Sequence, residues 1–153
     1  MKLSTKGRYG LRALIDLAVF SDNETVSIAS IAARQNISES YLEQLIAKLR
    51  KAGLVTSVRG AGGGYKLAKL AEEISVGDIL RALEGSLDPV ECPGLKEEST
   101  CGSSDFCVTK YVWQRINDSI NQTVDGISLS QLVEESKSVG NKAGSALSSC
   151  CNN

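Results

Sequence analysis

Three cysteines that could perform chemistry lie close together in the middle of the chain. Cys92, Cys101 and Cys107 are spaced Cys-x8-Cys-x5-Cys in a stretch of Gly, Ser and acidic residues, and the chain has no histidine. Thiolates are both nucleophiles and soft metal ligands. The spacing therefore predicts a metal centre, although a structural zinc site would normally show closely spaced cysteine pairs. Reduced thiols without a function and a redox disulfide are the alternatives.

The other two cysteines, Cys150 and Cys151, are adjacent near the end of the sequence. Adjacent cysteines seldom form a disulfide with each other, because the resulting ring is strained. We expect both to be exposed thiols that take no part in the metal site, with a long reach to the site as the alternative.

A second group of chemically capable residues shares one face of a predicted helix. Four apolar residues face the core at helical spacing: Leu42, Leu45, Ile46 and Leu49. The opposite face then presents Ser40, Glu43 and Gln44. These side chains can read base edges, since Gln pairs with adenine and Glu accepts a hydrogen bond from cytosine. The alternative is an ordinary solvated face on which Ser40 and Glu43 form a capping box.

Charge is divided unevenly along the chain. Residues 1–70 contain 11 Lys and Arg against 5 Asp and Glu, whereas residues 71–153 contain 6 against 13. A basic half joined to an acidic half is typical of a nucleic-acid-binding domain followed by a sensor or dimerisation region. Chance segregation of solvated charges is the alternative explanation.

Arg59 begins a glycine-rich stretch, Arg-Gly-Ala-Gly-Gly-Gly, between two strand-like segments at 54–58 and 65–68. A dinucleotide-binding loop would lead into a helix, but here the following residues alternate as a strand. The pattern therefore predicts a β-hairpin, in which Arg59 and Gly60 could approach a DNA groove or its phosphates. In the alternative interpretation the glycines serve only the tight turn.

The elements that carry these residues predict a mainly α fold. Two short helices joined by a tight turn follow a longer first helix, and each can begin at a Ser or Thr cap. With the hairpin as its wing and a further helix between Ser75 and Gly85, this region forms a winged helix-turn-helix domain over residues 1–85. The cysteine loop then covers residues 86–107.

A long helix is predicted after the loop, because apolar residues recur there at every fourth position: Val108, Val112, Ile116, Ile120 and Val124. An apolar row along one side of a helix is normally buried against another element. Its own domain could provide one, and so could a second subunit, since a two-fold dimer suits a palindromic DNA site. We assign residues 106–136 to this dimerisation helix and a short C-terminal helix. The polar tail, residues 137–153, is expected to be disordered.

Several classes of protein are disfavoured by the sequence. Nothing near the N-terminus resembles a signal peptide, and no apolar run approaches the length of a membrane span. We therefore expect a cytoplasmic protein with reduced thiols. Without histidine, a paired carboxylate or a nucleophile–base pattern, we do not expect an enzyme.

Three segments resemble a known family: MKLSTKGRYGLRALIDLA, ISESYLEQLIAKLRKAGLV and SVRGAGGGYKLAK. They are similar to the redox- and iron–sulfur-responsive winged-helix regulators that include IscR, NsrR, RirA and CymR. The resemblance covers roughly residues 1–135. It implies a homodimer that binds double-stranded DNA, with the long helices crossing at the dimer interface. It also implies base contacts by Ser40, Glu43 and Arg59, helped by Tyr41 and Gln44.

For the cysteine loop, the resemblance implies an iron–sulfur cluster, 2Fe–2S or 4Fe–4S, held by Cys92, Cys101 and Cys107. Soft sulfur ligands suit such a cluster, since they hold the iron and tune its potential. The fourth ligand is open, because two positions depart from the family pattern. Lys110 stands where IscR-type members have a histidine, and Arg8 stands where NsrR-type members have a carboxylate. Candidates are Glu91, Asp105, the partner chain and an exogenous small molecule.

Together these observations predict a transcription regulator whose DNA binding is modulated by the cluster. Its target genes would concern iron–sulfur cluster assembly or cysteine and iron metabolism, with iron–sulfur assembly proteins as further candidate partners. A nitric oxide or redox-sensing repressor of the same family is one alternative. A cluster-free repressor controlled by a partner protein, as in CymR, is another.

Overall fold

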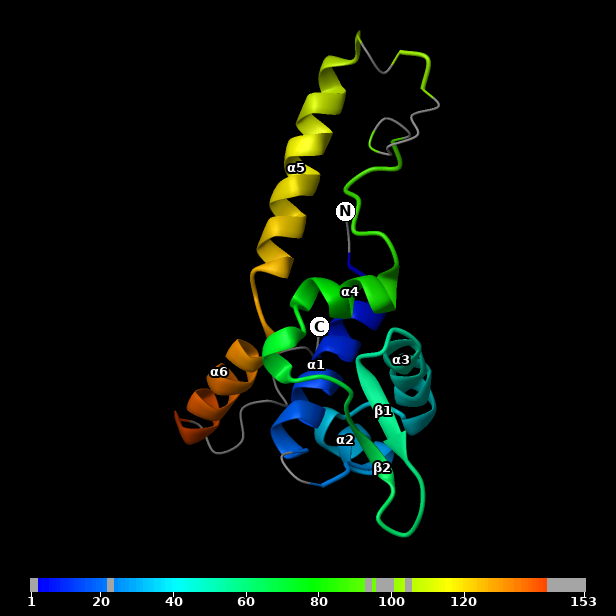
Figure 1. Ribbon diagram of the computed structural model, residues 1–153, viewed down its shortest axis with the longest axis vertical. Helices are drawn as coiled ribbons and strands as arrows, with labels where there is room; N and C mark the ends of the chain where they lie inside the picture. The colour runs from blue at the N-terminus through cyan, green and yellow to red at the C-terminus, as the bar shows by residue number, and fades with distance from the viewer. Residues whose placement is uncertain (1–2, 22–23, 93–94, 96–100, 104–105, 143–153) are drawn as a thin grey trace.

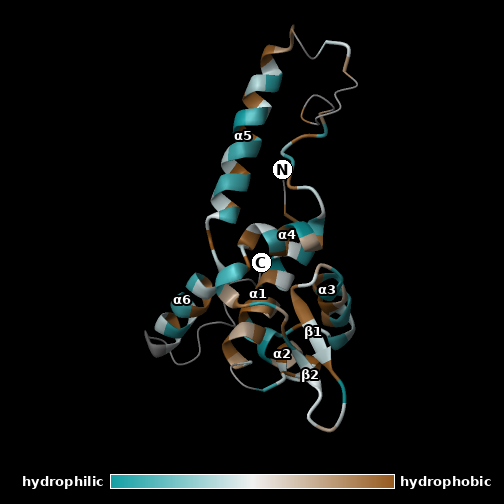
Figure 2. Cartoon of the chain, in the orientation of Figure 1, coloured by the Kyte–Doolittle hydropathy of each residue, from teal (hydrophilic) through white to brown (hydrophobic). Residues whose placement is uncertain are grey.

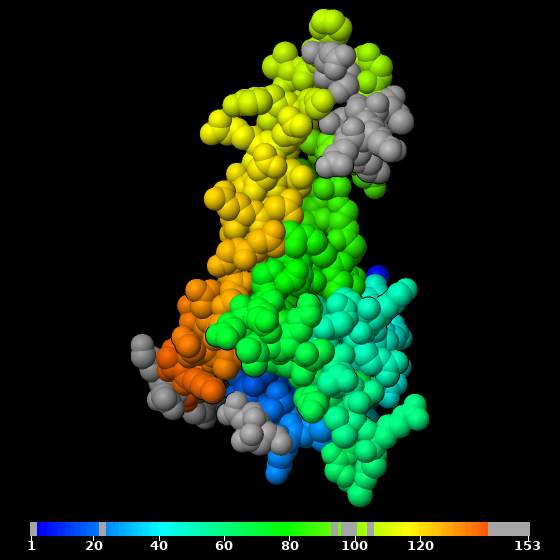
Figure 3. Space-filling view, viewed as in Figure 1, coloured from blue at the N-terminus to red at the C-terminus, as the bar shows by residue number. Residues whose placement is uncertain are grey.

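The computed structural model describes residues 3–21, 24–92, 95, 101–103 and 106–142. These residues form six α-helices, one short 3-10 helix and a two-stranded antiparallel sheet, as the prediction of a mainly α fold requires. One long helix projects from a body that holds the other elements (Figure 1 and Figure 3). In the described part of the chain, no helix has both the length and the hydrophobicity of a membrane span.

The first three helices form the helix-turn-helix unit. They are α1 (Thr5–Phe20), α2 (Ile28–Gln35) and α3 (Glu39–Lys51). Each begins at a serine whose side chain accepts a hydrogen bond from a backbone N–H of the first turn: Ser4, Ser27 and Ser38. Leucine and isoleucine side chains from all three helices are fully buried in one core, among them Leu14, Ile31, Leu42 and Leu45.

The wing is a hairpin of β1 (Val55–Val58) and β2 (Gly64–Leu67), each within one residue of its predicted position. Val55 pairs with Leu67, and Val58 with Gly64. A third segment, which the sequence did not indicate, joins the sheet at Val26. Its N–H and C=O exchange hydrogen bonds of 2.8 Å with Tyr65. This pairing covers the free edge of β2 and ties the wing to the start of α2.

The domain closes with η1 (Ala71–Glu73) and α4 (Val76–Glu84). Ser75 caps α4 and forms a capping box with Asp78, each side chain accepting from the other residue's backbone N–H at 3.0 Å. Gly85 ends the helix with a φ of 88°, a conformation that disfavours residues with a Cβ. The chain then enters the cysteine loop.

Helix α5 (Val108–Asp125) is the projecting element, and hydrophobic and hydrophilic residues alternate along it (Figure 1 and Figure 2). Helix α6 (Leu129–Lys142) returns to the body, where Leu129 is completely buried in the main core. α6 extends past residue 137, where the sequence predicted a disordered tail to begin. Val133 packs against the main core, and the helix continues alongside α1, which accounts for the extension. Residues 143–153 of the predicted tail lie outside the described residues.

Candidate DNA interface and cysteine loop

The outward face of α3 carries three polar side chains whose hydrogen-bonding groups are not used within the described chain. Ser40, Glu43 and Gln44 are exposed, while the four predicted apolar positions of α3 are buried. Ser38, not Ser40, is the helix cap: its hydroxyl accepts from the Tyr41 N–H at 3.3 Å. The capping-box explanation for Ser40 and Glu43 is therefore wrong. Their exposed position suits a helix that presents side chains to a groove.

Tyr41, predicted to assist base contacts, is half-buried and held by α1. Its hydroxyl donates to Thr5 Oγ1 at 3.2 Å, and its ring packs edge-to-face on Tyr9 with centroids 6.1 Å apart. Tyr9 in turn lies under the guanidinium of Arg12 at 5.5 Å. This arrangement fixes the first turn of α3 against the first turns of α1. The structure thus gives Tyr41 a part in positioning the exposed face beside it.

The angle between α1 and α2 is fixed by a buried carboxylate. Asp16 is 5% exposed, and both of its oxygens accept hydrogen bonds from the Arg34 guanidinium, the shortest at 2.6 Å. Gln35 donates to Asp16 at 2.8 Å and accepts from Arg12 at 3.0 Å. A buried charge is tolerated only when it is paired in this way. The network holds the two helices that support α3.

Arg59 and Gly60 are exposed to solvent at the end of β1. The hairpin and α3 lie on the same side of the body (Figure 1). Gly60 has a φ of 113°, which only glycine adopts without strain. Gly64 is also constrained, since a Cβ there would lie 2.8 Å from the Val26 carbonyl oxygen. The hairpin geometry therefore accounts for these two glycines. It leaves the Arg59 side chain exposed to solvent.

The three predicted cysteine ligands are free thiols, each half-buried, on the loop between α4 and α5. Within the described residues the structure does not bring them together as a group that could hold a metal ion. Cys107 is the N-terminal cap position of α5. A hydrogen bond with the Thr109 hydroxyl, 3.1 Å away, and the backbone N–H of Lys110 lower the pKa of the Cys107 thiol.

The chemistry of this donor set fits an iron–sulfur cluster. Three reduced thiols are available, and the environment of Cys107 favours the thiolate, which is the form that binds metal. Of the fourth-ligand candidates on this chain, Glu91 is exposed near Cys92, whereas Asp105 lies outside the described residues. Cys150 and Cys151 also lie outside them.

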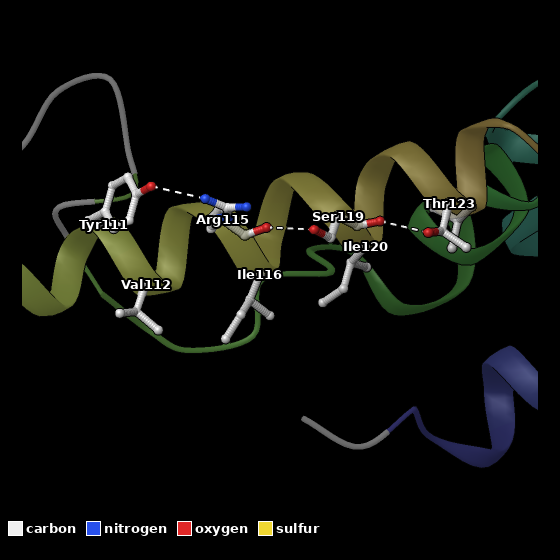
Figure 4. A pocket seen from close by; sticks show the side chains of 8 residues that line it. Tyr111, Val112, Arg115, Ile116, Ser119, Ile120 and Thr123 are labelled. Atoms are coloured by element: carbon white, nitrogen blue, oxygen red, sulfur yellow. Dashed lines mark hydrogen bonds between the residues drawn. The ribbon is translucent and has the colours of Figure 1, made fainter.

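A groove of about 590 Å³ runs along α5. Val112, Ile116 and Ile120 point to the same side of the helix in Figure 4. No α5 residue, all of which are described, is fully buried. Ser119 and Thr123, on the polar edge, each donate at 2.8 Å to the backbone carbonyl four residues earlier. The predicted apolar row is thus present, and Val108, Val112 and Ile116 are exposed in the part of the chain that the structure describes.

Two positioning contacts were missed by the sequence interpretation. Arg81 forms a forked ion pair with Asp125, joining α4 to the end of α5. Glu84 accepts hydrogen bonds from Ser4 and Gly7 at the start of α1. Each pair joins residues far apart in the chain, and a single exposed charge on a helix gives no sequence signal of its partner.

Comparisons with known proteins identify transcriptional regulators that are similar to this chain. A family model, Rrf2, described as an iron-dependent transcriptional regulator, matches residues 3–135. The HTH-type transcriptional regulator IscR of Aliivibrio salmonicida is 44% identical over 137 residues, covering 90% of this chain and 80% of the relative.

Two solved structures are similar to this chain over most of its length. IscR of T. potens is 47% identical with a TM-score of 0.73, covering 91% of this chain and 90% of that one. CymR, the global cysteine regulator of B. subtilis, is 42% identical with a TM-score of 0.73, covering 88% and 98%. The predicted resemblance is confirmed, and so is the prediction that the chain is not an enzyme. Since the family model spans most of the sequence and close relatives share the fold, the chain belongs to the Rrf2 family of transcriptional regulators.

Proposed function

We propose that this regulator is a homodimer whose affinity for a palindromic DNA site depends on an iron–sulfur cluster held by Cys92, Cys101 and Cys107. Its targets would be genes for iron–sulfur cluster assembly or for cysteine and iron metabolism. The observation that carries the DNA-binding part is the exposed face of α3, where Ser40 and Glu43 are free of any capping role. Polar side chains on an exposed helix beside a wing are the usual means of reading a major groove.

The wing supports the same proposal through charge. Arg59 is exposed at the end of β1, and its guanidinium would bind phosphates or enter a minor groove. Glu43 has the opposite effect, because a carboxylate is repelled by phosphates and gains only where it accepts from a cytosine amino group. We therefore assign affinity mainly to Arg59 and selectivity mainly to Glu43.

The groove on α5 supports a dimer formed with a second copy of the chain. Val112 is 46% and Ile116 38% exposed, so a partner helix would remove considerable apolar area from water. A partner helix could bury the polar edge of the groove at little cost in free energy, because the Ser119 and Thr123 hydroxyls already donate hydrogen bonds to carbonyls of their own helix. Ridges formed by residues four apart pack against like ridges at about −50°, which predicts crossed α5 helices.

The three loop cysteines would hold the cluster as thiolates, and a bound cluster would supply a group whose presence reports iron, oxygen or nitric oxide. Cys107 ends the loop at the first turn of α5, and Gly85 begins it at the end of α4. Ordering the loop would therefore restrain the two helices that flank it. A coupling of about 1–3 kcal/mol is enough to change DNA affinity roughly 5- to 150-fold.

A cluster-free regulator is the second candidate function. Two observations favour it: the described residues do not bring the three thiols together, and CymR, the global cysteine regulator of B. subtilis, has a similar fold. Such a protein would bind DNA in the same way, but a partner or a small molecule would control it.

The deciding experiment is purification without oxygen, followed by the visible absorption spectrum, the iron and sulfide content and DNA titrations. We expect a coloured protein whose DNA affinity changes when the cluster is removed. A colourless preparation with full DNA binding would favour the cluster-free candidate. In either form, Arg59→Ala should weaken DNA binding by about 1–3 kcal/mol at matched salt. Equal affinities for the two proteins would contradict the role of the wing.

A further inference from the structure

Among the described residues, the long helix α5 packs on the winged domain near its C-terminal end. Ile120 and Val124 pack on a small cluster formed by Val76, Leu80 and Leu87. Towards its N-terminus α5 rises clear of the body (Figure 1). The direction in which α5 points is therefore decided at this joint.

A polar fork lies beside the apolar contacts of the joint. The Arg81 guanidinium donates to Asp125 Oδ1 at 2.8 Å and Oδ2 at 2.7 Å, and its Nη2 also donates to Asn121 Oδ1 at 2.8 Å. Asp125 and Asn121 are one turn apart on α5, so the planar guanidinium of Arg81 on α4 forms hydrogen bonds with two successive turns of α5. The carboxamide of Asn121 is itself held, because its Nδ2 donates to the Asn117 carbonyl at 2.9 Å.

The fork supplies the directionality that the apolar contacts lack. Hydrophobic burial is non-directional and permits small rotations at nearly constant area. A bidentate guanidinium–carboxylate pair is planar and strongly orientation-dependent. Two backbone hydrogen bonds fix the position of the segment that follows α5. In these bonds the Val76 N–H donates to the Ile127 carbonyl and the Leu129 N–H donates to the Ile74 carbonyl. They lie beyond the helix and leave its tilt to be set by the fork.

The neighbouring glycine shows how closely the joint is packed. Gly77 lies against the Asp125 carboxylate, and a Cβ at this position would overlap Oδ1 and lie 2.8 Å from Arg81 Nη1. Gly77 is buried inside α4 with ordinary helical backbone. Alanine would therefore suit the helix but would push the carboxylate off the guanidinium.

We propose that Arg81 is a positioning residue that sets the spacing of DNA half-sites which the dimer accepts, by fixing the angle between α5 and the winged domain. This inference rests on the proposed dimer through α5. The 18 residues of α5 span about 27 Å, so a tilt of about 7° moves the far end by about 3 Å, close to one base-pair step. Loosening the fork would let the α3 helices of the two subunits adopt several separations.

The test compares DNA binding across a series of sites that differ only in the number of base pairs between two identical half-sites. Wild type should prefer one spacing by at least about tenfold. Arg81→Ala and Gly77→Ala should reduce this ratio to less than about threefold, while the affinity for an isolated half-site stays unchanged. Gly140→Ala, a matched exchange at an open position of α6, should behave as wild type.

The outcomes separate this inference from the proposed function. If wild type fails to bind any of the sites, the proposed function is wrong. If wild type prefers one half-site spacing and both variants keep the same preference, the proposed role of Arg81 is wrong. That role is also wrong if wild type binds the sites without any spacing preference. A monomeric Arg81→Ala protein would likewise overturn the inference, since the fork would then serve assembly. Should Arg81→Ala not fold, Gly77→Ala decides by the same ratio.

Discussion

The Glu84 carboxylate, at the last residue of α4, accepts two hydrogen bonds from Ser4, the N-cap of α1: from the backbone N–H at 3.0 Å and the hydroxyl at 2.7 Å. The Gly7 N–H donates to the same oxygen at 2.8 Å. The first N–H groups of a helix lack partners within the helix, and negative charge there is favoured by the helix dipole. Glu84 thus completes α1 from a position immediately before the cysteine loop.

The first prediction concerns the stability that this contact provides. Burial raises the pKa of Glu84, but the hydrogen bonds from Ser4 and Gly7 outweigh it, so the pKa lies below its usual value. A lowered pKa in the folded state means that stability is present above the unfolded-state pKa. That stability is lost as the pH falls through the folded-state pKa.

Glu84→Gln should therefore lower the free energy of unfolding by about 1–2 kcal/mol at neutral pH. The difference from wild type should shrink below about pH 4. Denaturant unfolding of both proteins at the two pH values measures it. Glu135→Gln, a matched exchange of an exposed carboxylate on α6, should have little effect at either pH. An equal loss at both pH values would show that the charge of Glu84 is unimportant.

The second prediction concerns the exposed carboxylate of α3. Glu43→Ala should relax the base preference at one position of each half-site, with overall affinity kept or raised, because a group that phosphates repel has been removed. Binding to a set of single-base variants of the DNA site provides the measurement. A specificity profile identical to that of wild type would remove Glu43 from base reading.

Local patterns account for what the sequence predicted well. Ser38 and Ser75 mark their helices because a cap acts on the backbone two or three residues away, within reach of a sequence window. The buried face of α3 follows from periodicity in the same way. The hairpin was found because the glycine stretch and the alternation beside it are adjacent in the chain.

Contacts between distant residues explain what the sequence did not predict. Val26 joins the sheet through Tyr65, and Arg81 pairs with Asp125, yet neither partner carries a local signal of the other. The length of α6 was underestimated for a related reason: residues 136–142 are mostly polar or small, and tertiary contact with α1 supports the helix where propensity is weak. For the cysteines, the sequence indicated that thiols could act as metal ligands, but it could not show whether the fold brings the three thiols together.

The third prediction tests the groove on α5. Ile116→Asp should weaken dimerisation by at least about tenfold, because a carboxylate would be buried against the partner helix without a countercharge. Gln114→Asp introduces the same charge on the same helix outside the groove and should leave the dimer intact. Molar mass measured by light scattering over a dilution series compares the three proteins. If Ile116→Asp stays dimeric at all concentrations, another surface forms the dimer.

The last prediction concerns the cysteine ligands. If Cys92, Cys101 and Cys107 hold an iron–sulfur cluster, replacing any one of them with alanine should abolish the visible absorbance of protein prepared without oxygen, since three thiolates are already a minimal set. Joint replacement of Cys150 and Cys151 should leave the absorbance intact and serves as the control. A cluster lost from the double variant but kept in Cys101→Ala would contradict the assignment.

Lys110 extends this prediction to the open fourth ligand. Its ammonium group cannot ligate iron while protonated, so Lys110→Ala should retain the cluster. Lys110→His introduces an imidazole three residues after Cys107, about one helical turn along α5 from this N-cap residue. Because an added protein ligand would replace an exchangeable one, we expect Lys110→His to slow the decay of cluster absorbance after air is admitted. The decay rate is measured for both variants and for wild type, with the iron content determined before exposure to air. If Lys110→His decays as fast as Lys110→Ala, the introduced imidazole is not the fourth ligand.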